Sequence, residues 1–238
     1  MFCLKQDCYS LLKLLLTIAL PVRKSSSHMM NNKFQFAVYM QKEIKDGDDM
    51  YYHASQTPNI KTLEPRISNH GIPLIYFSTK RENVLVYLSN AVEKYCKDTG
   101  FDYDGKWQKW GPYGFNDNGI LRLEEYYPNA LESTYKGVSG YIYSANSIVE
   151  ADFEVKIPHA ACSSNPVDVE SVEFVSDAYE AILDAEEKGL IAIMRYDEMP
   201  EKMREWNIRT ILQEYEEATD HPEYRYFLKG NFPDIIRG

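Results

Sequence analysis

Three side chains in the first half of the chain could together bind a flat ligand with polar edges. His53 lies in the short aromatic run 51–55, which turn-forming residues halt, so we expect it where a strand ends at a sheet edge. Tyr76 lies in a second strand expected over 74–78, and Tyr87 follows on a helix. Two phenol rings could stack on a planar aromatic amide while His53 offers a ring nitrogen to a sugar hydroxyl. Either tyrosine alone would also suit an amphipathic core position.

The helix that carries Tyr87 is expected from about Lys80 to Lys97. Thr79 and Glu82 have the spacing of a capping box, in which each side chain bonds the other residue's backbone N–H. Apolar residues then recur at helical spacing at Val84, Leu88, Ala91, Val92 and Tyr95.

These motifs resemble those of the diphtheria-toxin-like and poly(ADP-ribose)-polymerase-like ADP-ribosyltransferases. That superfamily has a His-Gly-Ser/Thr strand, an Ile-Tyr-Phe-Ala/Ser strand and a helix with a second tyrosine; the counterparts here are His53-Ala54-Ser55, Ile75-Tyr76-Phe77-Ser78 and Tyr87. The matching stretch is residues 50–96. The resemblance implies that His53 binds the nicotinamide ribose of NAD, and that Tyr76 and Tyr87 sandwich the nicotinamide ring.

The resemblance also assigns roles to neighbouring residues. Ala54 stands where the superfamily usually has glycine, whose backbone N–H and C=O hold the carboxamide, and alanine retains both groups. Ser55 and Ser78 complete the two strand motifs and are expected among the NAD contacts. Arg66 and His70, in the connection between the strands, could approach the diphosphate or the adenosine, although each also suits a solvent-facing turn.

The superfamily's third element is a glutamate on a later strand. Residues 168–175 alternate acidic and apolar types, as a half-buried strand does, and Glu173-Phe174-Val175 looks like the family's Glu-Tyr-Ile/Val segment. Glu173 would bond the ribose 2′-hydroxyl and stabilise the positive charge that develops as nicotinamide leaves, so the implied catalytic set is Glu173, His53 and Tyr76. Glu170, expected on the opposite strand face, and Glu223 are alternatives. The acidic face could also be simply solvated.

Composition limits the class of protein. The chain has 238 residues, 44% of them hydrophobic, which is ample for a packed core. A net charge of −10 argues against standing nucleic-acid binding, although it leaves a nucleic-acid substrate open. The four cysteines form no C-x-x-C pair and no cluster at metal-ligand spacing, so we expect no metal site and a reduced, cytoplasmic setting.

The N-terminal residues 1–33 are set apart from the rest. The apolar run 11–20 is interrupted by Lys13 and is too short to span a bilayer. It suits a weak export signal, a short anchoring helix, or translated sequence upstream of a start at Met29 or Met30. No stable membrane span is expected.

The remaining pattern predicts an α+β fold. Strands are expected at 34–40, 120–126, 138–143 and 152–156, and a short helix at 130–135. Residues 34–176 would form the core, which the resemblance implies is a mixed or antiparallel split β-sheet of ADP-ribosyltransferase type.

Residues 177–238 would form a helical extension packed on that core. A helix opens at Asp177, Gly189 follows it, and residues 191–194 suit a last strand or a buried turn. A longer helix after Pro200 carries an apolar stripe that we expect to dock on the core: Met203, Trp206, Ile208, Ile211, Leu212 and Tyr215.

Three functions are therefore considered. The first is a mono-ADP-ribosyltransferase that uses NAD as a substrate and modifies an unknown acceptor, which could be a protein, a nucleic acid, a small molecule or water. The second is an inactive NAD-binding or nucleotide-binding module of the same fold. The third is an interaction protein that uses the aromatic loop 101–115, unless those aromatic residues fill a core of their own.

Overall fold

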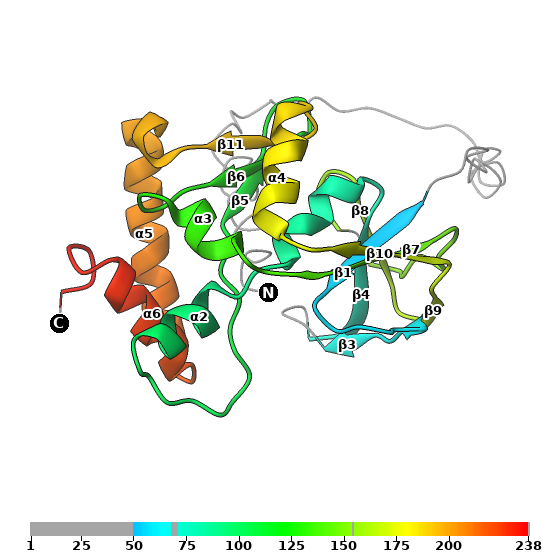
Figure 1. The fold of residues 1–238 in the computed structure, drawn as a ribbon, viewed down its shortest axis with the longest axis horizontal. Helices are drawn as coiled ribbons and strands as arrows, with labels where there is room; N and C mark the ends of the chain where they lie inside the picture. The colour runs from blue at the N-terminus through cyan, green and yellow to red at the C-terminus, as the bar shows by residue number, and fades with distance from the viewer. Residues whose placement is uncertain (1–49, 68–70, 154, 238) are drawn as a thin grey trace, which may run out of the picture.

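The computed structural model describes residues 50–67, 71–153 and 155–237. The expectations for 1–33, for the strand at 34–40 and for His70 concern residues outside these ranges. Figure 1 shows a large β-sheet at one end of the molecule and the last two helices at the other, with shorter helices and a small sheet between them.

The large sheet has six antiparallel strands in the order β10-β7-β1-β4-β3, with β8 also pairing with β4. The strands are β1 (Tyr51–Ser55), β3 (Arg66–Ile67), β4 (Pro73–Ser78), β7 (Gly140–Ala145), β8 (Ala160–Ser163) and β10 (Ser171–Val175). Strand β1 is therefore an interior strand, with β7 on one side and β4 on the other.

Two smaller sheets complete the β-structure of the described residues. Strands β5 (Tyr113–Phe115), β6 (Leu121–Glu124) and β11 (Ala192–Met194) form one, in which β11 runs parallel to β6. Strands β2 (Thr62–Leu63) and β9 (Val167–Asp168) form the other and lie against one face of the large sheet.

The helices are η1 (Arg81–Tyr87), α2 (Ala91–Asp98), α3 (Ala130–Tyr135), α4 (Ala178–Glu187), η2 (Tyr196–Glu198), α5 (Glu201–Glu217) and α6 (Pro222–Asn231), of which η1 and η2 are 3₁₀ helices. In the described parts of the chain, none of them combines the length and the apolar character that a bilayer crossing requires.

The predicted α+β class is confirmed. Strands β6 and β7 lie where strands were expected, and α3 occupies the predicted range. Asp177 caps α4, because its side chain accepts hydrogen bonds from the backbone N–H groups of Tyr179 and Glu180. Helix α4 packs with η1 and the large sheet in one hydrophobic cluster, and β11 pairs with β6, so residues 177–194 are built into the same core.

The prediction of one helix over 80–97 is wrong. The structure has the 3₁₀ helix η1, a break at residues 88–90, and then α2. Lys80 stands at the N-cap position without a side-chain cap bond, and the backbone N–H of Thr79 bonds the carbonyl of His159 instead of starting a helix. Residues 83–86 are all buried, so tertiary packing on every side outweighs the helical period of the sequence.

The strand predicted at 152–156 is also wrong for its described residues, which form bends and irregular chain. The strand predicted over 168–175 is interrupted: β9 ends at Asp168, and β10 begins only at Ser171. The two residues between them let the chain change from the small sheet to the large one.

Three aromatic residues of the 101–115 loop, Phe101, Trp107 and Trp110, pack in a second core. Trp110 is 5% exposed, and its ring contacts those of Tyr126, Tyr224, Phe227 and Phe232. This cluster joins the loop to α2, which directly precedes it, and to α5 and α6, which are far from it in sequence. These three aromatic residues therefore serve packing, as the interpretation of the loop aromatic residues as a core of their own predicted.

The expected docking of the apolar stripe on α5 is only partly right. Ile211 is buried, but Trp206, Ile208 and Leu212 are 40%, 43% and 39% exposed. The helix instead buries Asn207 and Thr210 beside Ile211, and the Asn207 amide bonds the sulfur of Met199. The face of α5 that packs on the rest of the protein is therefore rotated around the helix axis relative to its most apolar face.

Replacing Trp110 by alanine should lower the free energy of unfolding by about 3–5 kcal/mol, because it empties a buried site lined by four rings. Urea unfolding followed by circular dichroism measures this. Trp206→Ala is the matched control and should cost about 1 kcal/mol or less, since that ring is 40% exposed. Equal costs for the two variants would contradict the assignment of Trp110 to a core.

Candidate functional site

A hollow beside the end of β4 brings the two predicted tyrosines together. Its cavity volume is about 30 Å³. Its walls come from β4, η1, β5, β6 and the segment before β8, and consist of Tyr76, Phe77, Ser78, Asn83, Tyr87, Tyr113, Phe115, Leu121, Val155, Ile157, Pro158 and Ala160. Tyr76 and Tyr87 therefore share one environment, although they come from different elements.

The aromatic wall of this hollow continues beyond the two tyrosines. The hydroxyl oxygens of Tyr87 and Tyr113 lie 3.4 Å apart, and the rings of Tyr113 and Phe115 meet edge to face. Tyr87 is 38% exposed, so its ring lies at the mouth, whereas Asn83 is buried. Such a surface offers ring faces and a few polar groups, which suits a flat ligand with polar edges.

His53 does not line the hollow, and the expectation that it lies at a sheet edge is wrong. It is in the middle of β1, and its ring meets that of Phe77 edge to face, with centroids 6.0 Å apart. Because neighbouring strand residues point to opposite faces, His53 and Phe77 lie on one face of the sheet and Tyr76 lies on the other. His53 reaches Tyr76 only at its backbone, where Nδ1 is 2.9 Å from the carbonyl oxygen.

Burial lowers the pKa of His53 below its ordinary value of 6.5, and the positive charge of Arg66 lowers it further against the opposing effect of the bond to the Tyr76 carbonyl. The imidazole is therefore neutral at pH 7. In that form Nδ1–H donates to the carbonyl, which fixes the ring and ties β1 to β4.

Glu173 lies on the same face of the sheet as Tyr76. The strand registers place Glu173 opposite Ile142 and Ile142 opposite Ala54, and the pairing of Tyr52 with Ser78 sets Ala54 opposite Tyr76. The backbones of Glu173 and Tyr76 are thus three strand spacings apart, roughly 14 Å. Helix η1 packs on this face and carries Tyr87 at its C-terminal end.

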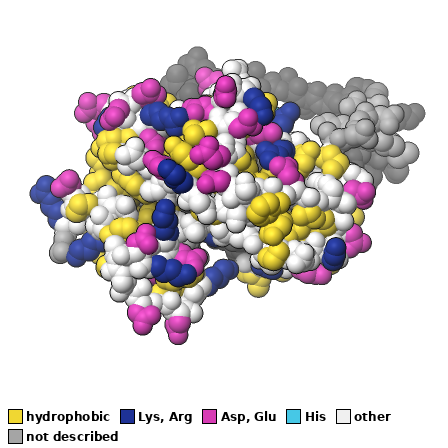
Figure 2. Space-filling model, viewed as in Figure 1, with side chains coloured by type: hydrophobic (Ala, Val, Ile, Leu, Met, Phe, Trp, Pro, Cys, Tyr) yellow, Lys and Arg dark blue, Asp and Glu magenta, His cyan; other side chains and the backbone are white. Residues whose placement is uncertain are grey.

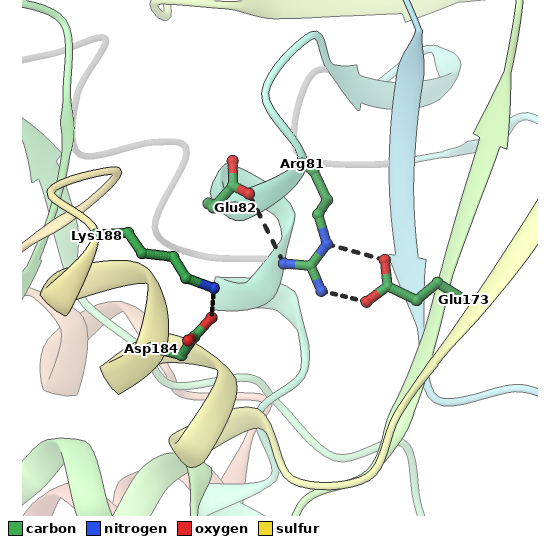
Figure 3. A network of polar contacts seen from close by, with 5 residues as sticks. All are labelled: Arg81, Glu82, Glu173, Asp184 and Lys188. Carbon is green, nitrogen blue, oxygen red and sulfur yellow. Dashed lines mark hydrogen bonds and ion pairs between the residues drawn. The ribbon is translucent and has the colours of Figure 1, made fainter.

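Arg81 holds the Glu173 carboxylate (Figure 3). Its Nε–H donates to one carboxylate oxygen at 2.9 Å, and Nη2 donates to the other. Nη1 lies 3.9 Å from Glu82, and the Asp184–Lys188 ion pair of α4 lies beside this network. The bidentate bond to Arg81 lowers the pKa of Glu173, so its carboxylate is ionised at neutral pH.

The other expected contacts are distributed around this site. Ala54 is buried in the core under η1, and the Ser55 and Ser78 hydroxyls accept bonds from the backbone N–H groups of Thr57 and Lys80, which shapes the two strand ends. Ser78 also lines the hollow. Arg66 is exposed on β3, and its contribution there is the electrostatic effect on His53.

The two alternative glutamates lie elsewhere. Glu170 is exposed between β9 and β10, where its backbone N–H bonds the carbonyl of Ser144. Glu223 is fully buried in α6, within the core formed by the C-terminal helices, and His221 lies 3.6 Å from its carboxylate. Of the three, Glu173 is on the face of the sheet that leads to the tyrosines.

Comparisons with known proteins identify no relative. A scan against protein-family models found no matching family, and searches of curated proteins and of solved structures found no similar chain or fold. Within the ranges that the structure describes, no group of three or more His, Cys, Asp or Glu side chains is placed to hold a metal ion.

Sequence reasoning missed several residues of the site. Arg81 falls within the helix predicted over 80–97, and no local pattern indicates that it bonds a glutamate 92 positions away in sequence. Asn83, Tyr113 and Phe115 were not connected with the tyrosines, because the fold and not the spacing brings β5 to η1. Only the aromatic character of residues 113 and 115 gave a signal.

The buried His53 should make folding stability depend on pH. Its pKa is lower in the folded protein than the ordinary 6.5, so the unfolded chain binds the proton more readily. Stability is then full above about pH 6.5 and falls as pH drops through that value towards the folded pKa. Urea unfolding at pH 7.5 and pH 5.5 should show a smaller difference for His53→Gln than for wild type. An unchanged difference would contradict the assignment.

Removing the guanidinium of Arg81 should raise the pKa of Glu173 towards the ordinary glutamate range. Carbon-13 NMR titration of the glutamate carboxylates in wild type and Arg81→Gln measures this, with Glu173→Gln used to assign the signal. Because Glu173 is 49% exposed, the cost in stability should stay below about 1 kcal/mol. A Glu173 titration identical in both proteins would contradict the ion pair.

Proposed function

We propose that this protein binds NAD and acts as a mono-ADP-ribosyltransferase, releasing nicotinamide and transferring ADP-ribose to an acceptor. One observation carries the proposal: Tyr76 and Tyr87 line a single hollow, and the ionised Glu173 lies on the same sheet face. The resemblance to the ADP-ribosyltransferase motifs supports the choice of NAD over other flat ligands.

In this proposal the nicotinamide ring stacks between the phenol rings of Tyr76 and Tyr87, and the ribose extends along the sheet towards Glu173. The bond between the ribose C1′ and the nicotinamide nitrogen breaks, and its electron pair leaves with nicotinamide. The Glu173 carboxylate stabilises the positive charge left on the ribose. A nucleophile of the acceptor then forms a bond to C1′ and loses its proton.

The bond to Arg81 limits how Glu173 would take part, and the place of His53 in the sheet limits its role. Both of its oxygens accept bonds from Arg81, so a ribose hydroxyl must either displace one guanidinium bond or share an oxygen with it. His53 would act as a positioning residue that ties Tyr76 to β1, since its ring lies on the opposite face from the hollow. The acceptor is a member of one of the four classes considered above that brings its nucleophile to the ribose C1′.

A second candidate is an NAD-binding module without turnover. The ion pair between Arg81 and Glu173 favours this second candidate, because a carboxylate already neutralised by a guanidinium stabilises a developing cation less well. The hollow and its tyrosines are the same in both candidates, so binding and chemistry must be measured separately.

Nicotinamide release from NAD, followed by chromatography, tests the chemistry. Glu173→Gln should reduce the rate by about 10²–10³, because it removes the charge that stabilises the transition state. Glu170→Gln is the matched control and should leave the rate unchanged. An equal rate in wild type and Glu173→Gln would remove Glu173 from the mechanism. NAD binding without release of nicotinamide would favour the second candidate.

Binding is tested by thermal unfolding with NAD. Ligand at about 100 times its dissociation constant should stabilise the fold by about 2.7 kcal/mol. Tyr76→Ala and Tyr87→Ala should each weaken binding by about 2- to 13-fold, which corresponds to losing about 0.5–1.5 kcal/mol of stacking. Tyr179→Ala, outside the hollow, is the control. The absence of any NAD effect on wild type would contradict both candidates.

A further inference from the structure

Strand β10 lies at one edge of the large sheet, where its outer side could pair with one more strand. Strand β10 pairs with β7 on one side, and within the described residues no strand pairs with its other side. Residues 171–174 are all exposed. Alternate backbone N–H and C=O groups of an edge strand point away from the sheet, so such an edge can accept one more strand.

The side chains of this edge are unusually apolar. Val172 is 49% exposed and Phe174 is 59% exposed. Both point to the face that carries Tyr141, whose ring lies 5.3 Å from that of Phe174. Figure 2 shows hydrophobic side chains gathered over the part of the molecule where Figure 1 places β10 and β7. The single charge of the strand, Glu173, is bonded to Arg81 on the other face. On the face of Val172 and Phe174, β10 therefore carries no charge of the kind that usually keeps edge strands unpaired.

We propose that residues 34–40 of the same chain add to this edge as an antiparallel strand beside β10. The segment reads Phe-Gln-Phe-Ala-Val-Tyr-Met, which is uncharged and rich in aromatic residues that favour strands. Its alternation puts Phe34, Phe36, Val38 and Met40 on one face. These side chains would extend the apolar face that Val172 and Phe174 begin.

The path of the chain fits this arrangement. Strands β1 and β10 are both antiparallel to β7, so they run in the same direction and begin at the same end of the sheet. A strand antiparallel to β10 would finish at that end, and the chain would then cross β10 and β7 to enter β1 at Tyr51. The crossing is about 14 Å, and residues 41–49 can span at most about 30 Å.

A second copy of the protein fits the edge less well. Antiparallel pairing of two β10 strands centred on Glu173 would bring two carboxylates opposite each other, which disfavours the pair. The proposal does not depend on NAD or on any role of Glu173 in chemistry.

Photo-crosslinking in the full-length chain tests the proposal. A photoreactive phenylalanine analogue replaces Phe174, and mass spectrometry identifies the crosslinked peptide. The proposal expects a product with the mass of the monomer and a peptide from residues 34–40. The same analogue at Val149, which is 65% exposed and outside β10, should not capture that peptide. A product with the mass of a dimer, or no product containing residues 34–40, would overturn the proposal.

Amide hydrogen exchange gives an independent readout. Backbone amides of residues 171–175 should be protected in wild type, and those on the outer side should lose that protection in Val38→Pro, since proline removes a donor and disrupts the added strand. Ser26→Pro is the control and should leave the protection intact. Fast exchange of the outer amides in wild type would contradict the proposal. The crosslinking result stands even if Val38→Pro fails to fold.

Discussion

The register of β1 between β7 and β4 is the constraint on which the site depends. It sets Ala54 opposite Tyr76 on one side and opposite Ile142 on the other, and β10 extends the row to Glu173. A shift by one residue would move every side chain of β1 to the other face. The bond from His53 to the Tyr76 carbonyl reinforces this register, because it links the same two strands through a side chain.

Local sequence patterns predicted the parts of the fold that local forces determine. Helix α3, the cap of α4 at Asp177, and strands β6 and β7 follow from periodicity and capping. Tertiary packing determined what the patterns missed. The helical period of 80–97 gave way to a 3₁₀ turn because residues 83–86 are enclosed on all sides, and α5 docks through Asn207 and Thr210 instead of its most apolar stripe.

The site shows the same division. The spacing of Tyr76 and Tyr87 was visible in the sequence, and both residues line one hollow. The position of His53 was not predictable from its own segment, because its face is decided by pairing with two strands that are distant in sequence. Arg81 could not be found at all by local reasoning, since its partner is on a strand formed much later in the chain. The assignment of NAD stays a prediction.

The second core, around Trp110, makes the middle of the chain and its C-terminal helices interdependent. Its rings come from the loop after α2, from Tyr126 and from α6 and the residues that follow it. A shortened protein ending before α5 would therefore expose the apolar side chains that α2 and the loop after it contribute to this core. Such a fragment should aggregate in solution, so a shortened version of this protein has to keep the C-terminal helices.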